Sequence, residues 1–294
     1  MARSSEGVGD LTLSQRRAES GPALLPVGWR AYRPPRWWFE VILILVLDTV
    51  YERLRDLVPL REHEAYARGW DLFHFEQRLG FDIELMLNRF VMHHHWLAKI
   101  ASYDYSFFHI PVTAAVLIWL FWRHRRTYKT ARSVLALTTI IGLIGFWLLP
   151  TAPPRLLNGA GFVDTTVFFH TPGSWSSRTV SEHSNLFAAM PSLHCAWALW
   201  AGLSIFFVAR HRLLRTIGIL YPIWTLFVVM ATANHFIFDA FAGYLCVAVS
   251  VVAVWALFGH HPWSPARDKD ELTRASQLKH DARSTEDDRA PSAV

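Results

Sequence analysis

Apolar positions gather in long blocks along the chain, and no short period dominates them. Six runs that are nearly free of charge are separated by polar stretches. A helix that rises about 1.5 Å per residue needs about 20 residues to cross the hydrocarbon layer, and the runs reach that length with their flanks. The pattern therefore predicts an all-α protein, a bundle of six transmembrane helices. The expected spans are about 38–57, 106–122, 133–149, 191–208, 213–233 and 237–258.

The polar ends and the first long loop complete this division. Residues 1–36 are rich in Ser, Gly, Arg and Glu, and residues 263–294 are polar with mixed charges. Both segments are expected to be disordered tails around a membrane domain at 37–262. The first apolar run comes too late for a cleavable signal peptide. Amphipathic stretches in the loop 58–105, such as 70–79, are expected to lie on the membrane surface.

Composition agrees with a membrane protein. The chain of 294 residues is 52% hydrophobic and contains 14 Trp, a residue that favours membrane–water interfaces. The net charge of +5 does not indicate nucleic acid, because the basic residues flank the apolar runs. Cys195 and Cys246 both lie inside apolar runs, so they are expected to pack as small apolar residues and not to form a disulfide framework.

The short loops predict an orientation. Segments 30–36, 123–132 and 210–215 carry Arg and Lys, and the last two contain no acid. With six spans all three fall on one side, which the positive-inside rule places in the cytoplasm. Both termini are therefore expected to be cytoplasmic in a multi-pass protein of the plasma membrane. The loops on the opposite side, about 58–105 and 150–190, mix acids and bases.

His235 and Asp239 form the first candidate site. On a helix, residues i and i+4 share a face. A carboxylate that binds one imidazole nitrogen fixes the tautomer and leaves the other nitrogen free to attack. The same spacing also fits a metal pair or an interfacial salt bridge. Ionisable residues at membrane depth are costly and are usually functional, which favours the catalytic interpretation.

The other candidates are expected at the same membrane face. Ser192 suits the start of a helix whose backbone N–H groups attract an anion, and His194 beside it could protonate a leaving oxygen. Arg155 could bind two phosphate oxygens at once. A water-facing His194 and an Arg155 that reaches lipid headgroups are the simpler alternatives. In the first span Asp48, Glu52 and Arg55 share one helical face, as a buried ion-pair network or, for Arg55, as a phosphate ligand.

These motifs together resemble a known family. The order is a Thr-Ala-Pro-Pro-Arg stretch ending at Arg155, a Met-Pro-Ser-Leu-His stretch ending at His194, and His235 with Asp239. It is similar to the type 2 phosphatidic acid phosphatase superfamily. The Pro-Ser-Leu-His sequence and the Gly-Phe-Val-Asp stretch at 161–164 resemble its inositol-phosphorylceramide-synthase-like branch of inositolphosphotransferases. The resemblance covers the six spans and leaves both tails outside.

The resemblance implies a role for each residue. His235 would be the nucleophile that forms a phosphohistidine, Asp239 would orient it, and His194 would act as general acid. Ser192 and Arg155 would bind the phosphate. The substrate would be a lipid phosphate, with water or an alcohol or polyol as acceptor. No metal and no cofactor are expected, since Arg and backbone N–H groups stabilise the phosphoryl charge.

The chain departs from the broader phosphatase pattern at two cationic positions. Leu148 stands where the phosphatases carry Lys, and Val228 stands where they carry Arg. Either Arg55 or Arg178 would replace these cations, or the phosphate is held differently. The departure favours the synthase-like branch. The loop 156–189, with Trp175, Arg178, Glu182 and Asn185, is expected to cover the site and to select the headgroup.

Two other classes of function stay open at this point. One is a transporter or channel whose pathway is lined by ionisable residues of the spans, namely Asp48, Glu52, His235 and Asp239. The other is a metallohydrolase that uses His235, Asp239 and His194 as ligands. A metal site in the run His93-His94-His95 is less favoured, because adjacent residues point in different directions on a helix.

Overall fold

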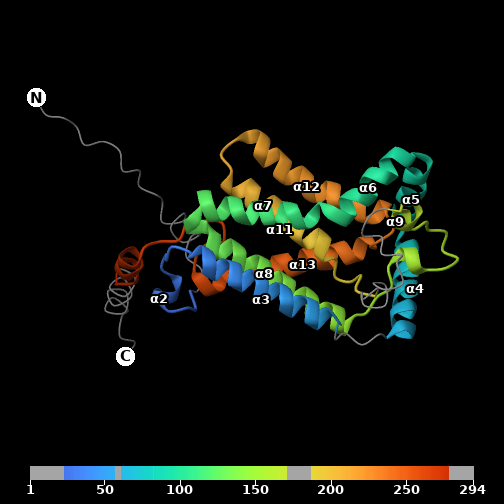
Figure 1. The fold of residues 1–294 in the computed structure, drawn as a ribbon. Coiled ribbons are helices and arrows are strands. Elements are labelled where there is room, and N and C mark those ends of the chain that lie inside the picture. Colours follow the sequence, from blue (N-terminus) through green and yellow to red (C-terminus); the bar gives the residue numbers. More distant parts are fainter. Residues whose placement is uncertain (1–22, 57–60, 82, 171–186, 278–294) are drawn as a thin grey trace, which may run out of the picture.

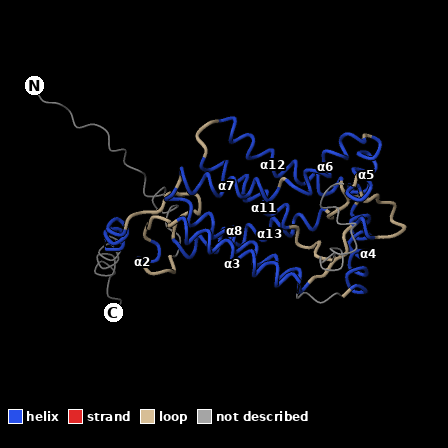
Figure 2. The backbone as a smooth tube through the Cα atoms, viewed as in Figure 1, coloured by secondary structure: helices blue, strands red, loops and turns tan. Residues whose placement is uncertain are grey.

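The computed structural model describes residues 23–56, 61–81, 83–170 and 187–277, with only the backbone for residues 47, 48, 50–52 and 54–56. The described chain is helical throughout, which confirms the all-α class, and it contains no strand (Figure 2). The helices are α2 (Val27–Arg30), α3 (Trp37–Asp56), α4 (Glu62–Leu79), α5 (Ile83–His93), α6 (His95–Phe107), α7 (His109–Arg123), α8 (Arg125–Leu148), the 3₁₀ turn η1 (Pro154–Leu156), α9 (Thr165–Phe168), α11 (Leu193–Val208), α12 (Arg212–Ala231) and α13 (Ile237–Phe258).

The long helices α3, α7, α8, α11, α12 and α13 run along one another as a bundle, and α4 crosses one end of it (Figure 1). Helix α11 lies at the centre, where it packs against α7, α8, α12 and α13. Its Trp200 is fully buried, and the indole N–H donates to the Ala131 carbonyl at 2.8 Å. This packing fixes the position of α11 in the bundle, and with it the position of its N-terminus, where the Pro-Ser-Leu-His motif lies.

The membrane spans are confirmed in part. Among the described residues α8, α12 and α13 are long and apolar enough to cross a membrane. Helices α6 and α7 pass the same test together, but a break bends them by 53°, so the chain has three or four candidate spans. The apolar part of α3 (Trp37–Val46) and α11 are shorter. Six spans therefore stay a prediction, and the expected second span is interrupted at Phe108.

Helix α4 contains the expected amphipathic stretch 70–79. It packs closely over the chain segment that follows α8. A Cβ atom at Gly69 would lie 2.8 Å from the Ala152 carbonyl oxygen, so only glycine allows this approach. The Ala152 N–H also donates to the Ala65 carbonyl at 3.0 Å. Whether α4 lies on a membrane surface stays a prediction.

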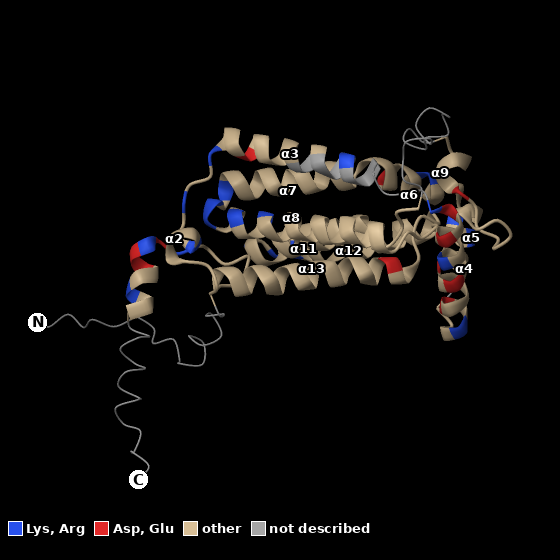
Figure 3. Ribbon diagram, turned by 90° about the horizontal axis from the view of Figure 1, so that it is seen from below, with Lys and Arg blue, Asp and Glu red and all other residues tan. Residues whose placement is uncertain are grey.

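The basic segments gather at the end of the bundle away from α4 (Figure 3). The Lys129 ammonium donates to the Trp29 carbonyl at 2.8 Å and lies close enough to Arg33 for electrostatic repulsion. His124 likewise lies close enough to Arg210 for electrostatic repulsion. The three segments expected on one side therefore lie together. The side of the membrane that they face stays a prediction.

Residues in both expected tails also contact this end. The N–H groups of Leu24 and Leu25 donate to carbonyls of α13 at 3.0 Å each. Trp263 is buried, and its indole N–H donates to the Ser204 hydroxyl at 2.8 Å. The division at residues 36 and 262 stays a prediction, although packed residues lie on both sides of it.

Candidate active site

Helix α11 begins at a buried serine. Ser192 is its N-cap, with no exposed surface, and the hydroxyl oxygen accepts the Cys195 N–H at 3.4 Å. Two glycines of neighbouring helices make room for this start. A Cβ at Gly243 of α13 would meet the Ser192 carbonyl oxygen, and one at Gly145 of α8 would meet the Pro191 ring. The anion-attracting first turn of α11 is therefore held by backbone-close contacts with α8 and α13.

His235 lies in the tight turn between α12 and α13. Ala233 has a φ of +56°, and the N–H groups of Asn234 and His235 both donate to the Val229 carbonyl, at 3.0 and 3.2 Å. His235 is 4% exposed. Its Nδ1 lies 3.0 Å from the Ala189 carbonyl oxygen and 3.5 Å from Asp239 Oδ2. A carbonyl only accepts, so Nδ1 carries the hydrogen.

The other ring nitrogen is the chemically available one. Nε2 of His235 is buried and has no hydrogen-bond partner among the described residues. With the proton on Nδ1, Nε2 presents a lone pair, as a nucleophile requires. The sequence predicted that Asp239 alone fixes this tautomer. The structure adds the nearer Ala189 carbonyl, which lies two residues before Pro191.

Asp239 ties the two histidine motifs together. It is fully buried, and Oδ2 accepts the Phe236 N–H at 2.9 Å at the start of α13. Its backbone carbonyl accepts the Ser192 N–H at 2.8 Å. Asp239 therefore links the start of α11 to the start of α13 through two hydrogen bonds.

His194 reaches the same space from the first turn of α11. Its ring centroid lies 5.7 Å from that of His235. The imidazole stacks on Tyr105 at 4.4 Å and contacts His109 at 4.1 Å. Tyr105 and His109 come from α6 and α7, on either side of the break. Sequence reasoning missed them, although a His inside an apolar run was a visible signal.

Arg155 is fixed by partners on both sides. Its Nε lies 3.2 Å from Asp164 Oδ2, and its guanidinium donates to the Asn234 side-chain oxygen. Its backbone N–H donates to the Ala233 carbonyl at 2.9 Å. Arg155 therefore lies against the turn that carries His235. Sequence reasoning missed Asn234, and it quoted Asp164 only as part of a motif.

Two further buried acids support the start of α13. Glu76 and Glu84 are 0% and 1% exposed. Glu84 accepts the Ile237 N–H at 2.6 Å, and Glu76 accepts the Phe238 N–H at 3.2 Å. Burial, followed by repulsion from Glu84, raises the pKa of Glu76 to about 9; burial also raises the pKa of Glu84. The raised pKa of Glu76 favours its protonated form, which limits negative charge beside a site for an anion.

Some predicted residues fall outside the described part. The side chains of Asp48, Glu52 and Arg55 in α3 are among them, as is the segment 171–186 with Arg178. Their roles stay predictions. Where the phosphatase pattern has cations, Val228 is buried in α12 and Leu148 is exposed at the end of α8. Among the described residues, no three His, Cys, Asp or Glu side chains lie close enough together to bind a metal ion. The three histidines at 93–95 do not form such a group either.

Comparison with known proteins gives the same family as the motifs. Residues 70–253 match the family model described as the PAP2 superfamily. A phosphoinositol dihydroceramide synthase of Bacteroides thetaiotaomicron is 24% identical over 186 residues, which cover 58% of this chain and 58% of that protein. No solved structure matches.

Proposed function

Since the chain belongs to the PAP2 superfamily, we propose that it is a membrane lipid phosphotransferase or lipid-phosphate phosphatase that works through a phosphohistidine at His235. One observation carries the proposal. Nε2 of His235 is buried without a partner among the described residues, while Nδ1 is held by the Ala189 carbonyl and Asp239. That arrangement presents a single lone pair toward the space shared with His194.

The first half of the reaction uses both histidines. Nε2 of His235 attacks the phosphorus, and the bond from phosphorus to the leaving oxygen breaks. His194 gives its proton to that oxygen, so the leaving group departs as an alcohol. Asp239 stabilises the charge that develops on the His235 ring. Arg155, the Ser192 hydroxyl and the first-turn N–H groups of α11 would bind the phosphoryl oxygens.

The second half returns the enzyme to its starting state. Water or an alcohol attacks the phosphohistidine, and His194 takes the proton of the attacking group. The bond between phosphorus and Nε2 breaks, and His235 is released. Water gives hydrolysis and a polyol gives transfer. The name of the Bacteroides relative favours transfer to or from an inositol-type headgroup. The active site would face the extracytoplasmic side, and no metal would be needed.

The experiment uses purified full-length protein and a panel of phospholipids labelled in the headgroup phosphate. Each lipid is incubated with a chelator, with and without inositol or other polyols. We expect released phosphate or a new phosphodiester in the presence of the chelator, and neither with His235→Ala. His63→Ala removes an exposed histidine of α4 and serves as the control. Full activity of His235→Ala would sink the assignment, and solute flux in liposomes without any product would favour the transporter alternative.

A further inference from the structure

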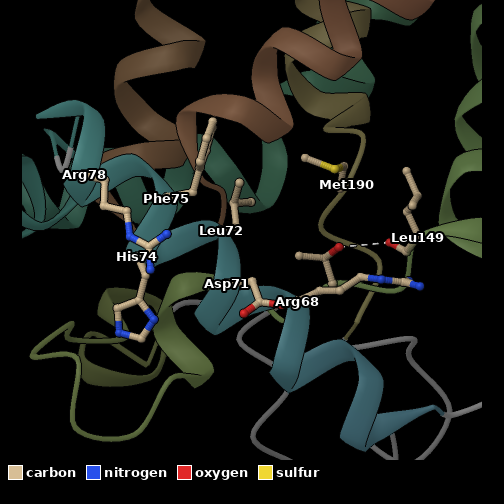
Figure 4. A pocket seen from close by; sticks show the side chains of 9 residues that line it. Arg68, Asp71, Leu72, His74, Phe75, Arg78, Leu149 and Met190 are labelled. Carbon is tan, nitrogen blue, oxygen red and sulfur yellow. Dashed lines mark hydrogen bonds between the residues drawn. The ribbon is translucent and has the colours of Figure 1, made fainter.

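A cavity of about 500 Å³ opens beside the catalytic turn, between α4 and the segments around residues 149–151 and Met190 (Figure 4). Its size lies within the usual range of about 300–1,000 Å³ for small-molecule sites. Neither His194 nor His235 is among the described residues that line it. The reaction proposed above does not use this space.

The charged side chains of the cavity favour an anion. Arg68 and Arg78 lie toward its two ends, with Asp71 between them (Figure 4). The Arg68 guanidinium is held by the carbonyls of Leu148 and Pro150, at 3.3 and 3.4 Å. Arg78 is exposed and makes no ion pair with any described residue. Arg68 also forms an ion pair with Glu64, which is outside the lining, at 3.8 Å. The lining itself has two guanidinium groups and one carboxylate, and the unpaired guanidinium of Arg78 has a planar fork that suits phosphate oxygens.

Apart from His74 and Thr151, the remaining wall is apolar, and it continues along the bundle. Leu72, Phe75, Leu149 and Met190 line the cavity. The Phe75 ring lies 5.3 Å from that of Phe238, the second residue of α13. Below it on α13, exposed apolar side chains continue the surface toward the middle of the bundle, namely Phe241, Leu245, Val249 and Val252. A small ion would leave this apolar surface uncovered, whereas the acyl tails of an amphiphile would bury it, which is favourable.

The cavity also borders the catalytic turn at two points. Met190 follows Ala189, whose carbonyl binds Nδ1 of His235. Phe238, in contact with Phe75, precedes Asp239. An amphiphile in the cavity would therefore lie next to the segments that position the nucleophile.

We propose that this cavity binds the phosphate-bearing headgroup of an anionic membrane phospholipid. Arg78 contacts the phosphate, Arg68 adds positive charge at the other end of the cavity, and the acyl chains follow the exposed apolar face of α13. The binding does not depend on the reaction at His235. Use of the cavity as a subsite for a lipid substrate does rest on the proposed function.

The test measures binding without turnover. Full-length protein with His235→Ala is titrated with dioleoyl phosphatidic acid or dioleoyl phosphatidylcholine, and the bound lipids are counted by native mass spectrometry. We expect tighter binding of phosphatidic acid. Because charged hydrogen bonds contribute about 1.5–3 kcal/mol, Arg78→Gln should weaken that binding about tenfold or more and leave phosphatidylcholine unchanged. Asp71→Asn should strengthen it, since a repelling carboxylate is lost.

Two controls distinguish a lipid headgroup from general charge attraction and from a soluble phosphate. Lys99→Gln removes an exposed charge from α6, outside the cavity, and should change neither lipid. Unchanged phosphatidic acid binding in both Arg78→Gln and Asp71→Asn would overturn the proposal. Displacement by glycerol 3-phosphate at equal concentration would also overturn it, because the site would then take a soluble phosphate. Either result leaves the test of His235 untouched, since that residue is absent throughout.

Discussion

Buried acids lie at both ends of the bundle, one at the basic end and two at the histidine end, and their charges are compensated in different ways. At the basic end Glu40 of α3 is 7% exposed, forms an ion pair with Arg132 of α8 and accepts the Tyr128 hydroxyl at 3.1 Å. At the histidine end Glu76 and Glu84 accept backbone N–H groups of α13 and pair with no Lys or Arg in the described chain. A cation pairs with the acid at the basic end, whereas burial raises the pKa of both acids at the histidine end and favours their protonated forms.

The difference separates stability from positioning. The Glu40 cluster joins α3 to α8 through side chains alone, so breaking it should loosen the bundle and leave the chemistry intact. Glu76 and Glu84 accept N–H groups of the first turn of α13. Asp239 in the same turn accepts two further backbone N–H groups, those of Phe236 and Ser192. Substitutions of these acids that remove an acceptor should therefore alter the position of His235 and change activity.

The largest effect is expected at Asp239. Asp239→Asn keeps an oxygen for the Phe236 N–H but loses the charge that stabilises the His235 ring during attack. We expect kcat to fall by about 10²–10⁴-fold, the range for a positioned acid–base group, with unchanged melting within a few degrees. Steady-state kinetics on a labelled lipid measure this loss. The exposed Asp270→Asn is the control, and equal kcat values in the two variants would contradict the role given to Asp239.

The next effect is on stability at the basic end. Arg132→Ala leaves Glu40 without its cation, which costs about 3 kcal/mol for a buried pair, so the midpoint of thermal unfolding in detergent should fall clearly. Activity per folded molecule should not change. A double variant with leucine at both positions should recover much of the midpoint. A drop in kcat that matches that of Asp239→Asn would remove the distinction between the clusters.

The third effect is a pH dependence at the histidine end. Glu76 has a folded pKa of about 9 against an ordinary value of 4.5. Between these values the folded state holds a proton that the unfolded chain releases, so a rising pH favours unfolding, by at most about 1.4 kcal/mol per pH unit. Thermal midpoints should therefore fall from pH 5 to pH 9. Glu76→Gln should flatten this slope and Glu40→Gln should not. Parallel slopes in all three proteins would contradict a proton held by Glu76 in the folded state.

The smallest effect is the activity of Glu76→Gln at neutral pH. Gln has the shape of the protonated acid and still accepts the Phe238 N–H, so kcat should stay within about threefold of the wild type. Glu76→Leu removes the acceptor and leaves a buried N–H unpaired, which should cost more. Comparison of the two variants distinguishes a role of Glu76 as hydrogen-bond acceptor for α13 from a role of its charge. A Gln variant as weak as the Leu variant would show that the charge itself is needed.

The sequence predicted the parts of the site that short motifs carry. Loop charges and apolar runs placed Arg155, His194 and His235 at one end, and the structure brings them there. Glu84 and Glu76 were not predictable, because the α13 residues whose N–H groups they accept lie 153 and 162 residues away in the chain. The turn at Ala233 was equally hidden, since alanine gives no signal of a positive φ.

The break between α6 and α7 is one of the differences between the expected and the observed spans, beside the short apolar stretches of α3 and α11. The apolar run suggested one helix from 106 onward, yet the chain bends by 53° between α6 and α7. Pro111 in the first turn of α7 has no N–H to donate to the Phe107 carbonyl, and proline is a common cause of such a bend. The bend lets Tyr105 and His109 reach His194 from two helices. The proline was therefore a local signal of the break, and the bend is what brings both side chains to the site.

The central claim is that Nε2 of His235 carries the phosphoryl group, and its most direct test is to trap that intermediate. Full-length protein is mixed with a lipid labelled in its phosphate, quenched in alkali within milliseconds, digested and sequenced by mass spectrometry. We predict an acid-labile phosphate on the peptide that contains His235, present in His63→Ala and absent in His235→Ala. A label on His194, or turnover with no label on any histidine, would contradict the account.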